Sequence, residues 1–212
     1  MTHCDEGDII EKKEAVMEQI IFHDFVLLNT VVDFCKCKLL DVIMPLITVL
    51  ADHGIVPIII GLILLLIPKT RRIGLSMAFS FIYGGVFGNL ILKNLVARPR
   101  PYSEIYPLQL RMFSESELLI EGLSDFSFPS GHTLIAFELA FVLVLMLRGR
   151  KEAISVFALI MAALIGFSRV YLYVHFPLDV LTGALLGCVF AILGVNTVKL
   201  IYKLIKPKSV QT

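Results

Sequence analysis

Charged residues are scarce in this chain: Asp, Glu, Lys and Arg make up 17% of its 212 residues, and the formal net charge is +1. Soluble domains contain about 25% charged residues, so the composition argues against a water-soluble globular domain. The 57% of hydrophobic residues argues equally against intrinsic disorder. Since no basic excess is available to neutralise a row of phosphates, we expect no nucleic-acid partner. The composition indicates a membrane protein.

Cysteine is also rare, with four residues in the chain. Cys35 and Cys37 form a close pair, but no second pair follows at the spacing of a zinc site. We expect ordinary thiols, no bound metal and no cofactor; lipidation or a weak metal site at this pair is the alternative. Residues 1–15 form a polar segment, and the eight charges among the first 18 residues are mostly acidic, which is not typical of a secretory signal peptide.

Long stretches without charge organise the rest of the chain. A bilayer core of about 30 Å needs roughly 20 helical residues, and fewer when the helix ends are polar and buried in a bundle. Five spans are predicted on this basis: 54–68, 73–92, 133–147, 153–168 and 180–198; the third of these contains one charged residue, Glu138. The shorter apolar stretch 39–50 contains Asp41 and Pro45 and is predicted to be a sixth span. Residues 16–34 mix apolar and charged side chains, which predicts an amphipathic helix lying at the membrane interface.

Basic residues in the short loops predict the orientation. They form four clusters: Lys36 and Lys38; Lys69, Arg71 and Arg72; Arg148, Arg150 and Lys151; and Lys199, Lys203, Lys206 and Lys208. With six spans all four clusters lie on one side, which the positive-inside rule makes cytoplasmic, together with both termini. With five spans the first cluster would lie opposite the others. We therefore predict an all-α, six-helix bundle in the plasma or inner membrane, a single domain over residues 1–212 with an extracytoplasmic loop at 101–129.

A second group of cations lies on the extracytoplasmic side, against this charge bias, together with the tight turn 51–54. Lys93, Arg98 and Arg100 close the third span, where Pro99 and Pro101 end the helix. Lysine supplies a point charge and arginine a planar fork that matches phosphate oxygens. The alternative is that these side chains snorkel at a helix end.

The fourth span opens with a second polar group. Ser130 stands where an N-cap would be, and Gly131 lets an anion approach the free N–H groups of the helix start. His132 then falls in the first turn, where it could donate a proton to a bound group. The alternative is a simple capped helix with an incidental histidine.

A third polar group straddles the turn between the fifth and sixth spans. Pro177 must break the helix near His175, which places Asp179 in the first turn of the next helix. That aspartate can accept a hydrogen bond from one imidazole nitrogen and leave the other as a nucleophile. Arg169 lies at a similar depth. Ionisable groups in a membrane are costly, and an anion such as phosphate is the shared ligand that explains all three groups.

The three groups together resemble the signature of the type 2 phosphatidic acid phosphatase family, whose superfamily includes bacterial class A acid phosphatases, glucose-6-phosphatase and vanadium haloperoxidases. The pattern is Lys93-x6-Arg100-Pro101, Pro129-Ser130-Gly131-His132 and Ser168-Arg169-x5-His175-x3-Asp179. The resemblance implies that His175 attacks phosphorus, that Asp179 orients it, and that His132 protonates the leaving oxygen and later activates water. It also implies a set of phosphate-binding residues: Lys93, Arg100, Ser130, Gly131 and Arg169.

The resemblance further implies an integral-membrane phosphatase that forms a phosphohistidine. Its substrate would be a lipid phosphate or polyprenyl diphosphate of the undecaprenyl diphosphate, phosphatidylglycerol phosphate or phosphatidate type. No carboxylate cluster suited to Mg²⁺ accompanies the motifs, so we expect metal-independent activity, and no obligate protein partner is evident. The alternatives are a phosphotransferase using the same intermediate, a vanadate-dependent peroxidase, and a non-catalytic lipid-binding or transport protein.

Three further features carry weaker expectations. Arg98 lies outside the fixed motif positions and is expected to snorkel, with contact to a second phosphate as the alternative. Glu138 lies about 9 Å below His132 along a helix axis, at 1.5 Å per residue, and is expected to face the bundle interior. Acidic residues of the long loop would discourage a highly anionic soluble substrate: Glu115, Glu117, Glu121 and Asp125.

Overall fold

A computed structural model of the chain describes residues 6–106, 125–147, 149 and 152–205. Within these ranges every regular element is helical, as predicted. The elements are α1 (Glu6–Cys35), α2 (Lys38–Val49), the 3₁₀ turn η1 (Asp52–Gly54), α3 (Ile55–Leu66), α4 (Arg71–Tyr83), the π-helical segment η2 (Gly84–Leu92), α5 (Lys93–Val96), α6 (Gly131–Met146), α7 (Glu152–Tyr171) and α8 (Pro177–Ile205).

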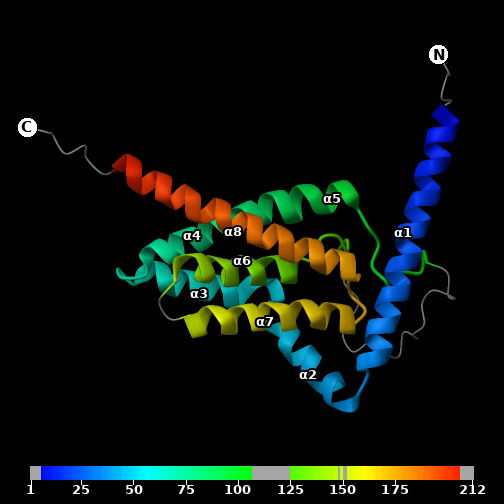
Figure 1. The fold of residues 1–212 in the computed structure, drawn as a ribbon, viewed down its shortest axis with the longest axis horizontal. Helices are drawn as coiled ribbons and strands as arrows, with labels where there is room; N and C mark the ends of the chain where they lie inside the picture. The colour runs from blue at the N-terminus through cyan, green and yellow to red at the C-terminus, as the bar shows by residue number, and fades with distance from the viewer. Residues whose placement is uncertain (1–5, 107–124, 148, 150–151, 206–212) are drawn as a thin grey trace, which may run out of the picture.

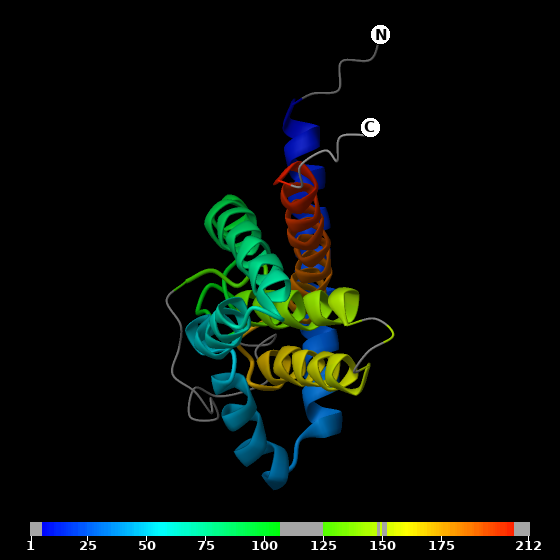
Figure 2. The same cartoon turned by 90° about the vertical axis from the view of Figure 1, so that its left-hand side faces the viewer.

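The helices α3, α4, α6, α7 and α8 run alongside one another, and α6 packs against α4, α7 and α8 (Figures 1 and 2). Four segments are long and apolar enough to cross a membrane: Lys38–Leu66, Arg71–Val96, Glu152–Tyr171 and Pro177–Ile205. Helix α6 is also apolar but has only 16 residues. The structure therefore has the helical, apolar architecture that the charge-free stretches predicted.

Small residues on α8 allow α6 to approach closely. A Cβ added to Gly183 would lie 2.7 Å from the carbonyl oxygen of Ser130, and one added to Gly187 would lie 2.6 Å from that of Leu134. Small residues at such contacts are typical of helix pairs in membranes, where packing drives association. This contact fixes the start of α6, which carries part of the polar site, against the start of α8.

The predicted sixth span is not confirmed. Helix α2 has 12 residues, about 18 Å at 1.5 Å per residue, and continues through η1 into α3 as the single apolar stretch Lys38–Leu66. His53 and Gly54, with φ of 48° and 69°, turn the chain between the two helices. The α1–α2 junction and the α3–α4 junction lie toward opposite ends of the bundle (Figure 1). The basic residues at these two junctions are therefore separated, which is the arrangement expected from five spans.

Helix α1 crosses one end of the bundle, transverse to the helices that run along it (Figures 1 and 2). The predicted amphipathic helix over 16–34 is not confirmed, because Asp24 and Asn29 are buried while Phe22 and Val26 are exposed. The buried apolar residues of α1 form one cluster with the α7–α8 junction and Tyr106: Phe25, Leu28, Val32, Tyr106, Val170, Tyr173 and Phe176. The buried polar side chains of α1, Asp24 and Asn29, therefore lie against the protein interior.

Candidate active site

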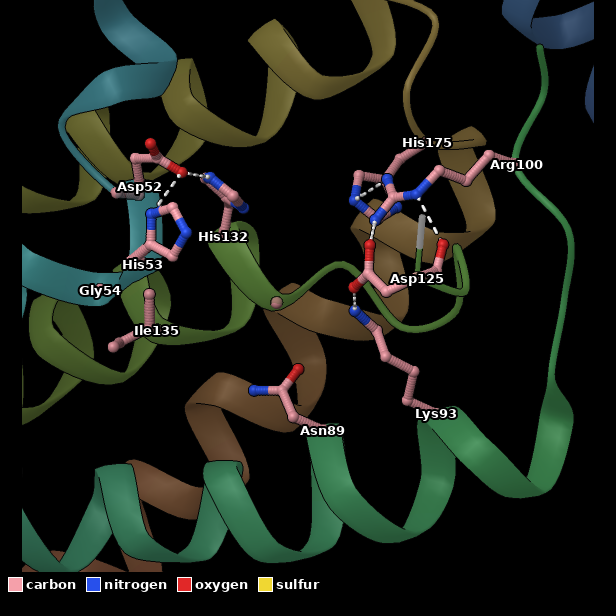
Figure 3. Close-up of a pocket in the computed structure, with 12 residues that line it drawn as sticks. Asp52, His53, Gly54, Asn89, Lys93, Arg100, Asp125, His132, Ile135 and His175 are labelled. Atoms are coloured by element: carbon pink, nitrogen blue, oxygen red, sulfur yellow. Dashed lines mark hydrogen bonds and ion pairs between the residues drawn. The ribbon is translucent and has the colours of Figure 1, made fainter. Parts of the chain in front are cut away.

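The three polar groups predicted from the sequence meet at the end of the bundle that α1 crosses. A pocket of about 380 Å³ lies there, and Figure 3 shows its walls. Its polar lining includes side chains from all three groups: Lys93, Arg100, His132 and His175. Gly131 and the turn Ala51–Gly54 line it as well, so the turn lies on the same side as the motifs, as expected. His132 and His175 stand on two sides of the pocket (Figure 3).

Lys93 and Arg100 are joined by a carboxylate of the loop segment before α6. Ala97 adopts a left-handed conformation, with φ of 47°, and ends α5, so that the chain turns back toward the pocket before Arg100. Lys93 Nζ and Arg100 Nη2 each lie 2.5 Å from one carboxylate oxygen of Asp125. Burial by itself would raise the pKa of Asp125, but hydrogen bonds from Lys93 and the charge of Arg100 lower it to about 2. The predicted phosphate-binding cations thus already hold an anionic group (Figure 3).

His175 lies behind this pair, in the turn between α7 and α8, and is 1% exposed. Its Nε2 lies 3.2 Å from Arg100 Nη1, which can only donate, so Nε2 carries the lone pair. Its Nδ1 lies 3.6 Å from Asp179 Oδ2 and 3.5 Å from the hydroxyl of Ser127, which donates to the same Oδ2 atom. Burial is the main cause that lowers the pKa of His175 to about 4. The imidazole is therefore neutral at pH 7, with Nε2 unprotonated.

The start of α6 forms the opposite wall. Ser130 is the N-cap, as predicted, and its hydroxyl accepts from the N–H of Thr133. His132 Nε2 lies 3.4 Å from Asp52 Oδ1 in η1, and His53 Nδ1 lies 3.2 Å from the same oxygen. The free N–H groups of this helix start and its dipole favour an anion in the pocket.

Arg169, in the last turn of α7, is buried, with 2% of its surface exposed, and is not among the residues that line the pocket. Its Nη1 donates to the hydroxyl of Thr48 at 2.5 Å. Among the described residues, its Nε and Nη2 have no hydrogen-bond partner. Buried donors without a partner are costly, so a guanidinium in this state indicates that an anion completes its hydrogen bonds when it is bound.

Arg98 does not snorkel, and that expectation is wrong. Its side chain is 11% exposed, and its Nη1 lies 2.8 Å from Asp179 Oδ1 and 2.9 Å from Asp24 Oδ2 on α1. The guanidinium also stacks on the Phe176 ring, 3.8 Å from the centroid. Arg98 turns inward because two buried carboxylates, one of them 74 positions away in α1, compensate its charge.

Comparison with known families agrees with this geometry. A family model described as the PAP2 superfamily matches residues 71–203, which include every residue of the three motifs. This chain belongs to the PAP2 superfamily. The match begins at the first residue of α4, so α1, α2 and α3 lie outside it.

Relatives of this PAP2 protein include named phosphatases. An undecaprenyl-diphosphatase of Sulfolobus acidocaldarius is 35% identical over 134 residues, which cover 63% of this chain and 59% of that protein. Phosphatidylglycerophosphatase B of Bacillus subtilis is 38% identical over 106 residues, which cover 47% of this chain and 45% of that protein. The chain thus spans less than two thirds of the length of either relative.

Two solved structures share the fold of this PAP2 protein. One is the first transmembrane PAP2 type phosphatidylglycerolphosphate phosphatase from Bacillus subtilis, with a TM-score of 0.63 and 30% identity, covering 91% of this chain and 89% of that one. The other is LpxE of Aquifex aeolicus, with a TM-score of 0.60 and 29% identity, covering 80% and 93%. The similarity therefore extends beyond the family-model match into the N-terminal part of this chain.

The structure describes some of the residues in the remaining sequence predictions and leaves others outside its described range. Glu138 is fully buried in this PAP2 protein, which confirms that it faces the interior. Three acidic loop residues lie outside the described residues: Glu115, Glu117 and Glu121. Cys35 and Cys37 are free thiols. Among the described residues, no group of three or more His, Cys, Asp or Glu side chains could hold a metal ion.

Sequence reasoning missed three polar residues that contact the motif side chains. Asp52 faces His132, Ser127 bridges Asp179 and His175, and Asp24 pairs with Arg98. Ser127 stands only three positions before Ser130, so its proximity to a motif was the one available signal. Asp24 gave no such signal, because its partner is distant in the sequence and because its own helix was predicted to lie at the membrane interface.

Proposed function

We propose that this PAP2 protein is a lipid phosphatase that hydrolyses a lipid phosphate or polyprenyl diphosphate through a phosphohistidine. One observation carries the proposal: the unprotonated Nε2 of His175 lies beside the guanidinium of Arg100, on the opposite side of the pocket from His132. A phosphoryl group bound to Arg100 would lie next to a neutral nucleophile on one side and His132 on the other. Burial and the charges of Arg169 and His175 lower the pKa of His132 to about 3 in the empty pocket, and the negative charge of a bound phosphoryl group would raise it so that His132 becomes the proton donor.

The reaction proceeds in two displacements. His175 Nε2 attacks phosphorus, an N–P bond forms, and the P–O bond to the leaving group breaks as His132 protonates the leaving oxygen. His132 then accepts a proton from water, the hydroxyl attacks phosphorus, and the N–P bond breaks to release inorganic phosphate and the neutral imidazole. Asp179 stabilises the positive charge on the ring of the phosphohistidine, whose Nδ1 it faces.

Phosphoryl transfer depends on positioning and charge neutralisation, and this site supplies both. Lys93 and Arg100 would hold phosphoryl oxygens in place of the Asp125 carboxylate, and the unpartnered nitrogens of Arg169 would add two donors. The capped start of α6, from Ser130 and Gly131, adds backbone N–H groups. Because fixed cations neutralise the charge, activity is expected to persist fully in excess EDTA; loss in EDTA that Mg²⁺ restores would contradict this.

The position of the pocket favours a lipid substrate. An apolar cavity of about 380 Å³ between α3, α6 and α7 lies next to it, since Leu50 and Ala136 line the cavity while their neighbours Ala51 and Ile135 line the pocket. A headgroup in the pocket could therefore keep a hydrocarbon chain in apolar surroundings. The α3–α4 junction, with its basic cluster, would face the cytoplasm, and the pocket and the transverse α1, at the opposite end of the bundle, would then lie at the outer membrane surface.

The test is release of inorganic phosphate by the purified protein in detergent from a panel of lipid monophosphates and polyprenyl diphosphates. We expect release from at least one lipid and none from the His175→Ala variant. Equal release by that variant would exclude His175 as the nucleophile. Phosphate transfer to an added alcohol in preference to water would instead indicate a phosphotransferase.

A further inference from the structure

We propose that Asp24 on α1 is a positioning residue of this active site, which acts through Arg98 to keep the negative charge of Asp179 available to His175. The inference rests on the proposed function, since it concerns the charge that develops on His175. It gives a role in the chemistry to a helix that lies outside the family-model match and outside the three motifs.

The contacts form an unbroken line from α1 to His175. Asp24, whose side chain is 1% exposed, lies 2.9 Å from Arg98 Nη1, and the same nitrogen lies 2.8 Å from Asp179 Oδ1. The other oxygen of Asp179 faces His175 Nδ1 at 3.6 Å. Asp24 is held in turn by the N–H of Leu178, which donates to its Oδ1 at 3.3 Å.

The charges along this line explain why a second carboxylate is present. Arg98 and Asp24 form a neutral pair, so Asp179 retains one uncompensated negative charge toward the imidazole. Without Asp24 the charge of Arg98 would offset that of Asp179, and the cationic ring of the phosphohistidine would lose its counter-charge. Because the groups are buried, their interactions are screened far less than at a protein surface.

The orientation of Asp179 does not depend on Arg98 alone. Its Oδ2 accepts from the N–H of Phe176 at 2.9 Å and from the hydroxyl of Ser127. Neutralising Asp24 and Arg98 together should therefore leave Asp179 in place with its charge still available. This predicts that the two substitutions compensate one another, which a purely structural role of Asp24 would not produce.

The experiment compares Asp24→Asn, Arg98→Gln and the double variant with the wild type. We expect kcat to fall about tenfold in Asp24→Asn, as for about one unit of pKa shift at the imidazole, and to recover to within about threefold of the wild type in the double variant. Arg98→Gln alone leaves the charge of Asp179 uncompensated and should not lower kcat by this route. The value of KM should stay within about twofold throughout, because neither side chain lines the pocket. Asp33→Asn, an exposed carboxylate on the same helix, is the matched control and should leave kcat unchanged.

The pH profile supplies a second readout that depends on the sign of the charge. The acid limb of kcat/KM, which reports protonation of His175, should move to lower pH in Asp24→Asn and to higher pH in Arg98→Gln. The other charged or titratable groups that face His175 are unchanged in these variants: Asp179 from α8, Arg169 from α7, His132 from α6 and Arg100. If the acid limb of kcat/KM moved in the same direction in both single variants, the proposal would be overturned.

Loss of folding must be separated from loss of charge. Asp24→Glu keeps the charge and should retain most of the wild-type kcat, whereas Asp24→Asn should not. Equal kcat in Asp24→Asn and the wild type, or a double variant slower than both single variants, would refute the role of Asp24. If the His175→Ala variant remained active, the proposed function itself would fail, so the two failures are distinguishable.

Discussion

Asp125 occupies the place that a phosphoryl group would take in the proposed reaction, which leads to a prediction about affinity. Its carboxylate bridges Lys93 and Arg100, at 2.5 Å from each cation, inside the pocket. A phosphoryl group that binds the same two cations must displace it. Replacing Asp125 by Asn removes the competing charge, so the variant should bind phosphate more tightly than the wild type.

The size of the effect follows from the pKa of Asp125, which lies at about 2 instead of its ordinary 3.8. A shift of nearly two units corresponds to roughly 2.5 kcal/mol between the ionised and neutral forms. The side chain is 53% exposed, so solvent screening reduces the usable part to about 1 kcal/mol. We therefore expect KM for substrate and the inhibition constant of inorganic phosphate to fall about fivefold, because 1.4 kcal/mol is a factor of ten.

Steady-state kinetics of the purified variant, with phosphate as product inhibitor, measures both constants. Arg100 should stay in place without the carboxylate, because it also donates to the backbone oxygens of Asp125 and Val174, at 2.9 and 2.8 Å. Asp125→Glu, which keeps the charge, and Glu104→Gln, an exposed carboxylate nearby, are the controls and should leave both constants unchanged. A rise of KM in Asp125→Asn would refute competition and show that the carboxylate holds the cations in position.

Two further predictions concern the nucleophile and the hydrocarbon chain. Since the pKa of His175 is about 4, protonation of this nucleophile should cause no decrease of kcat/KM as the pH falls from 7 to about 5, and a decrease only below that; a decrease with its half-maximal point near 6.5 in a buffer series would contradict a buried, neutral imidazole. Ala158→Phe, in the apolar cavity, should raise KM for a long-chain lipid phosphate roughly tenfold, the value of about two buried methylene groups, but not KM for a short-chain soluble analogue. An equal rise in Ala163→Phe, on the exposed face of the same helix, would contradict that assignment.

Those parts of the site that depend on local signals could be predicted from the sequence. Ser130 caps a helix because its hydroxyl bonds to a backbone group three positions away, and Pro177 is the first residue of α8, a position that suits proline at the start of a new helix. His175 and Asp179 approach one another because a turn and the first turn of a helix separate them. Each of these relations is contained in fewer than ten residues.

Relations between distant segments could not be predicted in the same way. Arg98 at a helix end has the same local sequence whether it reaches water or a buried carboxylate, and only the position of α1 decides between them. Likewise, residues 38–50 are apolar enough for a span, but α2 has only 12 residues. It leads from α1 to the turn at His53, which lines the pocket. The predicted sixth span is not confirmed for the same reason.

The link between fold and site can be tested at the contact that places Lys93. Segment η2 leads directly into Lys93, and it packs on α6 at Gly84, where an added Cβ would lie 2.5 Å from Leu134 Cδ2 and closer still to Glu138 Oε1. Gly84→Ala must therefore displace the buried side chains of Leu134 and Glu138, which should lower the free energy of unfolding by about 1–3 kcal/mol.

The neighbouring glycine provides the matched control. A Cβ on Gly85 would have no atom within 4 Å, so Gly85→Ala should leave stability unchanged or raise it by up to about 1 kcal/mol through helix propensity. If η2 positions Lys93 through this contact, Gly84→Ala should also raise the inhibition constant of phosphate, while Gly85→Ala should not. A lower melting temperature with unaltered phosphate binding would mean that the contact stabilises the bundle without setting the position of Lys93, and the geometry of the cation pair would then have to come from Arg100 and the loop before α6.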